Sequence, residues 1–128
     1  MLLVYPAIFH QEESAVWVEF PDLEGCQSYG DTVEECIIEA QEALGAYVES
    51  IIERDMKLPV ATDVRNISVQ DKNSFVMPIY NELKVYAKEN KAVKKTLTIP
   101  QWLNDRAIRN NINFSEVLQN ALIEKICR

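Results

Sequence analysis

Hydrophobic and polar residues alternate over the first twenty positions, which predicts two β-strands. The segments LLVYPAIF (residues 2–9) and AVWVEF (residues 15–20) are rich in β-branched and aromatic residues, and the polar stretch HQEES separates them. Proline has no backbone N–H to donate, so we expect Pro6 to lie at a sheet edge or at a bulge. Together the two segments predict the start of an antiparallel sheet.

The period of the apolar pattern changes at Thr32, where apolar residues begin to recur at steps of three and four. Thr32 followed by Glu35 is a capping-box pattern, and Pro59 stops any helix that comes before it. We therefore predict one long amphipathic helix over residues 32–54. The preceding stretch FPDLEGCQSYGDT contains one proline and two glycines and predicts a structured loop.

Two further segments after this helix have strand-like patterns, DVRNISV (residues 63–69) and SFVMPI (residues 74–79). The resulting order β-β-α-β-β predicts an α+β domain over residues 1–80, with one helix packed on three or four antiparallel strands. The polar and charged stretch NELKVYAKENK (residues 81–91) predicts a hinge to a second domain over residues 92–128.

The second domain begins with one short alternating segment, AVKKTLTI (residues 92–99). Alternation places two apolar side chains on one side and three polar ones on the other: Leu97 and Ile99 against Lys94, Thr96 and Thr98. Pro100 ends this strand and suits the start of a helix, which QWLNDRAIRNN continues. Ser115 is expected to cap a second helix, whose apolar residues share one face.

A single strand leaves its backbone donors and acceptors unpaired, and a unit below about 40 residues buries too little apolar surface to fold alone. We therefore predict that a second copy of the chain supplies the missing strand. The product is a homodimer with a two-stranded ribbon and four helices, which could assemble further. Its predicted core contains Leu97, Ile99, Val117, Leu118 and Leu122. The alternative is that KKTLTI is a charged edge strand of the first domain.

Charge is distributed unevenly along the chain. Residues 1–80 carry fifteen acidic and four basic side chains, a net charge of −11, whereas residues 81–128 carry five acidic and nine basic ones, a net charge of +4. Such asymmetry suggests two different partners, one of them a polyanion.

The polar side of the predicted ribbon has side chains that can read DNA. A two-stranded ribbon fits the major groove, which is about 12 Å wide, where lysine reaches guanine or phosphate and threonine contacts the thymine methyl group. Backbone amides at the start of the second helix form a candidate phosphate site. The predicted DNA-binding residues are Lys94, Thr96, Thr98, Phe114, Ser115 and Glu116.

The sequence gives little support to metal, cofactor or enzymatic chemistry. Its three cysteines show no C-x-x-C spacing and there is one histidine, so we expect neither a metal site nor a cofactor. Carboxylates near the second strand lack the spacing that a two-metal nuclease needs. No apolar run approaches the ~20 residues of a membrane span, so we expect a soluble, cytoplasmic protein that does not bind membranes.

Two parts of the chain resemble a known family. YPAIF, followed by VWVEFPDLEGCQSYGDTVEECIIEAQEAL, resembles HicB-type antitoxins of HicAB toxin–antitoxin systems, and the tail resembles a ribbon-helix-helix DNA-binding domain. The match covers nearly the whole chain. Most of its specificity lies in FPDLEGC and in four residues before or within the start of the long helix: Gly30, Asp31, Thr32 and Glu35.

This resemblance implies an antitoxin and not an enzyme. It implies a truncated ribonuclease H-like first domain that masks the small mRNA-cleaving toxin HicA, and a second domain that binds the operator of its own operon. An RNA-cutting enzyme tends to present a basic surface, so we expect toxin contacts at acidic positions such as Asp22 and Glu24. The alternative is a ligand-responsive ribbon-helix-helix repressor without a toxin partner.

Overall fold

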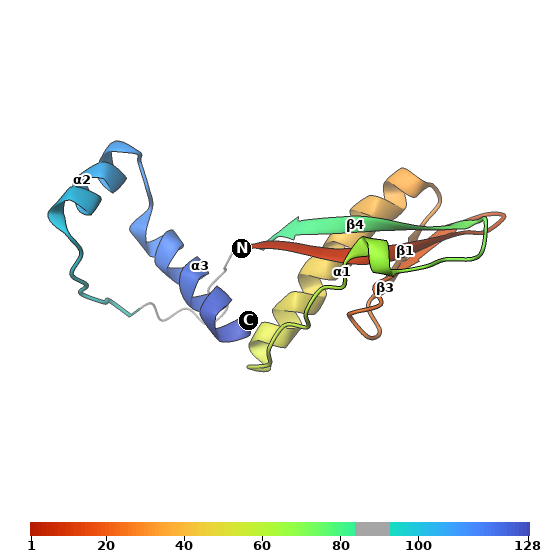
Figure 1. The fold of residues 1–128 in the computed structure, drawn as a ribbon, viewed down its shortest axis with the longest axis horizontal. Helices are drawn as coiled ribbons and strands as arrows, with labels where there is room; N and C mark the ends of the chain where they lie inside the picture. Colours follow the sequence, from red (N-terminus) through yellow and green to blue (C-terminus); the bar gives the residue numbers. More distant parts are fainter. Residues whose placement is uncertain (84–92) are drawn as a thin grey trace. The chain divides into compact units, whose positions relative to one another are not determined.

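The structure is a computed structural model that describes residues 1–83 and 93–128, and the chain forms two compact units (Figure 1). One unit comprises Met1–Leu83 with Cys127–Arg128, and the other comprises Lys84–Ile126. Most of the predicted hinge, from residue 84 to residue 91, lies outside the described residues. Its first two residues belong to the last strand of the first unit.

The first unit is an antiparallel sheet with one long helix, which confirms the α+β class (Figure 1). Its strands are β1 (Leu2–Gln11), β2 (Val16–Glu19), β3 (Gln27–Gly30) and β4 (Ser74–Glu82), arranged in the order β3-β2-β1-β4. The strands predicted at the start of the chain are confirmed as β1 and β2. The one predicted at residues 74–79 is confirmed as β4.

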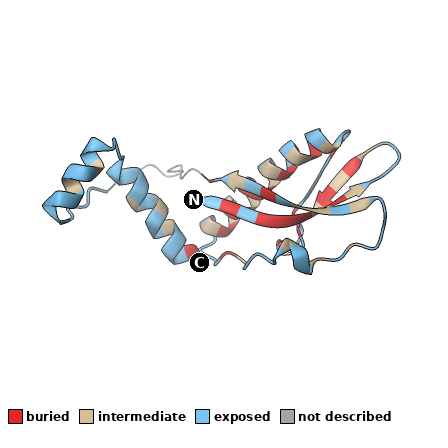
Figure 2. Ribbon diagram, turned by 45° about the horizontal axis from the view of Figure 1, so that its top comes forward, coloured by how far each residue is buried: buried red, intermediate tan, exposed pale blue. Residues whose placement is uncertain are grey.

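Alternate residues of β1 are buried together with one face of the helix α1 (Val33–Glu53), and they form the core of the first unit (Figure 2). The buried side chains of these two elements are Leu3, Tyr5, Ala7, Phe9, Cys36, Ala40, Leu44, Val48 and Ile51. Phe9 also stacks on Phe75 of β4, with ring centroids 5.1 Å apart. Burial of each large apolar side chain contributes about 1.5–3 kcal/mol, so this layer accounts for much of the unit's stability.

Hydrogen bonds at both ends fix the helix α1, and the prediction of a helix at residues 32–54 is confirmed. At its start the Thr32 hydroxyl accepts from the Glu35 N–H at 3.2 Å, and the Glu35 carboxylate accepts from the Asp31 N–H at 3.1 Å. At its end Asp55 adopts a left-handed φ of 54°, and the N–H groups of Asp55 and Met56 donate to the carbonyls of Ile52 and Ile51 in the last turn.

The expectation that β1 lies at an edge at Pro6 is confirmed, because β1 pairs there with β4 alone and becomes a central strand only farther along. Pro6 lies opposite Pro78 in a continuous register. Met1 and Leu83 exchange two backbone hydrogen bonds, so the alternation of the ladder makes the proline pair a non-hydrogen-bonded one. On its other side β1 pairs with β2 only over residues 8–11, so no carbonyl of β2 lies opposite Pro6 and lacks a donor there.

The predicted strand at residues 63–69 is also wrong, because this segment contains the 3-10 turn η1 (Val64–Asn66). The Asp63 carboxylate caps that turn by accepting from the Arg65 N–H at 2.9 Å and from the Arg65 guanidinium at 2.7 Å. These bonds, led by those of the guanidinium, hold the pKa of Asp63 below its usual value. A local side-chain bond therefore prevails over weak β-propensity in this segment.

The strand β3 lies inside the stretch that the sequence predicts as a structured loop. Its inward-facing residues are Ser28 and Gly30, which pair with buried residues of β2, so no apolar alternation marks it. A Cβ added at Gly30 would lie 2.7 Å from the Cys36 nitrogen. Glycine at this position therefore lets the strand approach the first turn of α1.

The second unit contains the two predicted helices, α2 (Gln101–Arg109) and, up to Ile126, α3 (Phe114–Cys127). Ser115 does not cap α3 as expected. Asn113 does so, because its side-chain oxygen accepts from the Glu116 N–H at 3.1 Å and its carbonyl accepts from the Val117 N–H. The predicted strand at residues 92–99 is described from residue 93, and in this single chain that part forms neither helix nor strand.

Candidate functional site

The polar residues that the sequence predicts as DNA readers lie in the exposed segment before α2. Lys94, Thr96 and Thr98 are all exposed. Within the described ranges, their side chains form no hydrogen bond or ion pair. These groups therefore remain accessible to a ligand, and they bring positive charge and hydroxyl groups to the segment.

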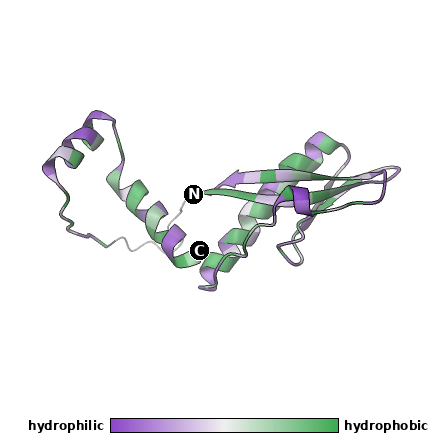
Figure 3. Cartoon of the chain, viewed as in Figure 1, coloured by the Kyte–Doolittle hydropathy of each residue, from purple (hydrophilic) through white to green (hydrophobic). Residues whose placement is uncertain are grey.

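The apolar residues predicted to form the dimer core are uncovered in the single chain. Leu97 is 62% exposed, Val117 54% and Leu122 51%, while Ile99 is also exposed and Leu118 is half-buried. Figure 3 shows the apolar residues that run along α3. Exposed apolar surface on this scale in a small unit is typical of an interaction surface.

The start of α3 offers fewer free amides than the sequence suggests. Phe114, Ser115 and Glu116 are exposed, but the Glu116 N–H already donates to Asn113. In the described part of the chain, the N–H groups of Phe114 and Ser115 have no hydrogen-bond acceptor. An anion at this end of α3 would therefore be held by two backbone donors.

The two predicted toxin-contact residues have different surroundings. The Asp22 carboxylate accepts from the Thr62 N–H at 2.8 Å and from the Thr62 hydroxyl at 2.6 Å, so it ties the loop after β2 to the segment after α1. Glu24 is exposed, and its carboxylate forms no hydrogen bond or ion pair with the described residues. Asp22 thus has a structural role in addition to any contact it makes.

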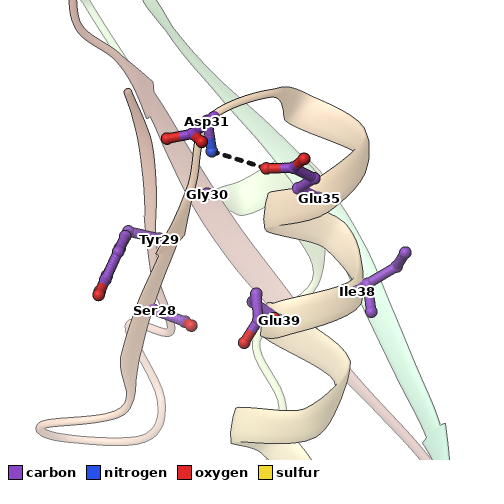
Figure 4. Close-up of a pocket in the computed structure, with 7 residues that line it drawn as sticks. All are labelled: Ser28, Tyr29, Gly30, Asp31, Glu35, Ile38 and Glu39. Carbon is purple, nitrogen blue, oxygen red and sulfur yellow. Dashed lines mark hydrogen bonds between the residues drawn. The ribbon is translucent and has the colours of Figure 1, made fainter. Parts of the chain in front are cut away.

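A hollow of about 400 Å³ lies between β3 and the first turns of α1 (Figure 4). Its lining residues are Ser28, Tyr29, Gly30, Asp31, Glu35, Ile38 and Glu39. Ser28 and Glu39 point into the space from opposite sides, while Tyr29 points away from the helix and is 74% exposed. Sequence reasoning missed this surface because it missed β3. The capping pair Thr32 and Glu35 was the only local signal.

His10 is held on the sheet face opposite α1 by three neighbours. Its ring stacks on Trp17 at a centroid distance of 4.0 Å, and its Nδ1 lies 2.9 Å from the Ser74 hydroxyl. Its Nε2 lies 3.7 Å from the Glu19 carboxylate, which is too long for a hydrogen bond. The serine and histidine therefore lack the third group that orients the base in a hydrolytic triad.

Cys26 and Cys36 of the first unit are buried and act as small apolar residues in the core. Burial raises the pKa of the Cys26 thiol to about 11 and also raises that of Cys36. A thiol that stays protonated is a poor nucleophile and a poor metal ligand. In the part of the chain that the structure describes, no three His, Cys, Asp or Glu side chains come together as a metal site would require. No helix there is long and apolar enough to cross a membrane.

Comparison with known proteins gives consistent matches over almost the whole chain. Residues 5–125 match the family model described as the HicB-like antitoxin of bacterial toxin–antitoxin systems. An uncharacterised 14.9 kDa protein from the rep-hol intergenic region of Haemophilus phage HP1 is 28% identical over 105 residues, covering 81% of this chain and 78% of that protein.

Solved structures of similar proteins have the same fold. A chain of a toxin–antitoxin complex from Streptococcus pneumoniae is 29% identical, with a TM-score of 0.61 and coverage of 98% of this chain and 99% of that one. The antitoxin HicB of Burkholderia pseudomallei is 19% identical, with a TM-score of 0.65 and coverage of 96% and 98% respectively. At that identity the second likeness concerns the fold alone.

Proposed function

This chain belongs to the HicB-like antitoxin family of bacterial toxin–antitoxin systems, and from that premise we propose that it binds and masks a HicA-type toxin. We further propose that it represses its own operon through a dimeric ribbon-helix-helix domain. The single observation that carries the first proposal is the family match, which spans both units.

The first unit is the proposed toxin-binding part. It holds the acidic excess of the chain, with fifteen acidic and four basic residues up to position 80. An enzyme that cuts mRNA needs a basic surface for its substrate, so an acidic protein can cover that surface and steer association. The similar chain from Streptococcus pneumoniae comes from a toxin–antitoxin complex, which supports a toxin as the partner.

The second unit is the proposed DNA-binding and dimerisation part. Its helices expose their apolar residues, and the segment before α2 has no strand partner among the described residues. Antiparallel pairing of this segment with a second copy would satisfy its backbone groups and bury Leu97 and Ile99 in a shared core. One symmetric contact would then pair the backbone groups of the segment and bury its apolar side chains.

The proposed DNA contact follows from the same pairing. If Leu97 and Ile99 face the shared core, the alternation of the strand turns Lys94, Thr96 and Thr98 outward as one surface in each copy. Two such strands present a narrow polar ribbon of the kind that enters the major groove. The N-terminal end of α3 would hold a flanking phosphate.

Coexpression tests the antitoxin role directly. The HicA-type protein encoded next to this chain's gene should stop growth when expressed alone, and growth should return when this chain is coexpressed. The two proteins should also copurify through a tag on either one. Continued arrest in the presence of well-expressed, folded antitoxin would refute the proposal.

A further inference from the structure

We infer that the toxin docks on the free edge of β3, where an extended segment of the toxin adds to the sheet as a further strand. This inference rests on the proposed function and specifies the surface and the chemistry of the partner. The added strand would run beside the hollow between β3 and α1, with basic side chains directed at the carboxylates of the helix (Figure 4).

The backbone of β3 offers free hydrogen-bonding groups along this edge. The Phe20 N–H donates to the Cys26 carbonyl at 3.2 Å, which sets the alternation of the β2–β3 ladder. Ser28 therefore directs its backbone groups toward β2, whereas Gln27 and Tyr29 direct theirs toward the open edge. A partner strand can bond to both residues without displacing any contact of the first unit.

The opposite edge of the sheet is less suited to such an addition. That edge is β4, and its central residue Pro78 faces Pro6 in a non-hydrogen-bonded pair. The backbone nitrogen of Pro78 therefore points toward the open side, where it has no hydrogen to donate. A strand added to β4 would lose a bond at its centre, so β3 is the better docking edge.

The side chains around the hollow specify the composition of the added strand. Glu35 and Glu39 lie on the helix side of the edge, and Tyr29 lies on the other face (Figure 4). Because side chains of a strand alternate between faces, every second residue of the partner would approach the two carboxylates. We expect lysine or arginine at those positions. At the positions between them we expect apolar or arginine side chains, which can pack on the ring of Tyr29.

Charge also favours the toxin over a second copy of this chain as the partner that binds the β3 edge. Pairing of β3 with β3 of another copy would bring two sets of acidic side chains, Asp31, Glu35 and Glu39, to one small surface. Like charges placed together without compensation oppose such a contact. A basic partner gains from the same arrangement.

A proline substitution at Tyr29 tests the backbone contact. Tyr29→Pro removes the N–H that points to the open edge, and Tyr29→Ala is the matched control that removes only the ring. The N–H is not part of the β2–β3 ladder, so the sheet should stay intact. In titrations of the full chain with the HicA-type protein, the proline variant should bind about tenfold more weakly than the alanine variant, because backbone bonds are lost.

A charge reversal tests the side-chain contact. Glu39→Arg should weaken toxin binding by about tenfold or more, since it places a positive charge beside basic side chains of the toxin. Glu13→Arg is the matched control, because Glu13 is exposed in the turn between β1 and β2 and the change in net charge is the same. That control should stay within about twofold of the unmodified chain.

The outcomes distinguish this inference from the proposed function. If the unmodified chain binds the toxin and both Tyr29→Pro and Glu39→Arg bind equally well, docking at β3 is overturned while the antitoxin role stands. If the unmodified chain binds no toxin, the proposed function itself fails. If the variants leave toxin binding unchanged and instead alter the mass of the free protein in light scattering, β3 pairs with a second copy and the inference is wrong. Thermal melting would verify that each variant is folded.

Discussion

Asp22 accepts two hydrogen bonds from Thr62, 2.8 Å from the backbone N–H and 2.6 Å from the hydroxyl, across 40 residues of sequence. The pair fastens the loop after β2 to the segment that leads from α1 to β4. Asp22→Ala removes both bonds, so we expect it to lower the free energy of unfolding by about 1–2 kcal/mol in urea titrations. Thr62→Val removes only the hydroxyl bond and should cost less.

The same variants separate the structural role of Asp22 from its predicted toxin contact. If Asp22 touches the toxin, Asp22→Ala should weaken toxin binding more than Thr62→Val does, once both variants are folded. Glu24→Ala is the companion variant, because Glu24 is exposed and its carboxylate bonds to none of the described residues. Equal toxin affinity for all three variants would count against both predicted contacts.

Replacement of Gly30 should destabilise the first unit. In Gly30→Ala the new Cβ would lie 2.7 Å from the Cys36 nitrogen and 3.1 Å from its Cα, and these backbone atoms cannot move aside without shifting α1. Such overpacking typically costs about 1–3 kcal/mol, which urea titration would detect. Gly25→Ala is an informative comparison: its site is open, and its φ of +80° makes the cost one of backbone strain alone.

Ribbon readout predicts that Thr96→Ala combined with Thr98→Ala weakens binding to the promoter DNA of the chain's own operon. Each lost threonine contact to a base pair should cost about 1 kcal/mol or more, which a fluorescence anisotropy titration would resolve. Toxin binding should be unchanged, because these residues lie in the other unit. Unaltered promoter affinity would argue against ribbon readout.

Salt dependence gives a second test of the DNA proposal. Lysine contacts to phosphate release counterions, so the logarithm of the association constant should fall linearly as salt rises. The variant Lys94→Ala should show a shallower slope, by about two contacts in a symmetric dimer. A slope that is near zero for the unmodified chain would point away from DNA as the ligand.

Deletion of residues 92–128 should separate the two activities. The shortened chain should lose promoter binding and dimerisation, because both are assigned to the second unit. It should still neutralise the toxin in the growth assay, because the sheet and α1 lie within the first 83 residues. Loss of neutralisation by a shortened chain that remains folded would move the toxin site out of the first unit.

The buried thiol of Cys26 predicts a loss of stability at high pH. Its pKa of about 11 lies above the ordinary value of 9.0, so the folded state keeps the proton while the unfolded state releases it. This contribution is complete below pH 9 and is lost as the pH rises toward 11. The free energy of unfolding should therefore fall over that range. The fall should be smaller in Cys26→Ala, which controls for tyrosine and lysine ionisation.

Elements with strong apolar periodicity were predictable from the sequence. The helix α1 and the strands β1, β2 and β4 follow from patterns that packing in the structure reinforces. Both helices of the tail follow from their patterns alone, because most of their apolar residues are exposed in the single chain. By contrast, β3 carries serine and glycine on its inner face, so its pairing with β2 leaves no apolar trace. The segment at residues 63–69 was predicted as a strand from its β-branched residues, but the Asp63 side chain caps a 3-10 turn there.

The candidate sites likewise differ in how far the sequence predicts them. The exposed polar and apolar residues of the tail follow from alternation, and the prediction of a second strand from another copy rests on the short length of the tail. The hollow beside β3 depends on a strand that the sequence did not reveal, so its carboxylates could not be grouped in advance. The ribonuclease H-like character of the first unit and the dimeric ribbon stay predictions.

The facing prolines in β1 and β4 have a consequence for how the protein assembles. Because Pro78 interrupts the β4 rim of the sheet, a strand that added there would lose a hydrogen bond at its centre. Two copies of the chain that met β4 against β4 would each carry this interruption. The proline therefore opposes edge-to-edge aggregation through that rim at no cost to the β1–β4 ladder.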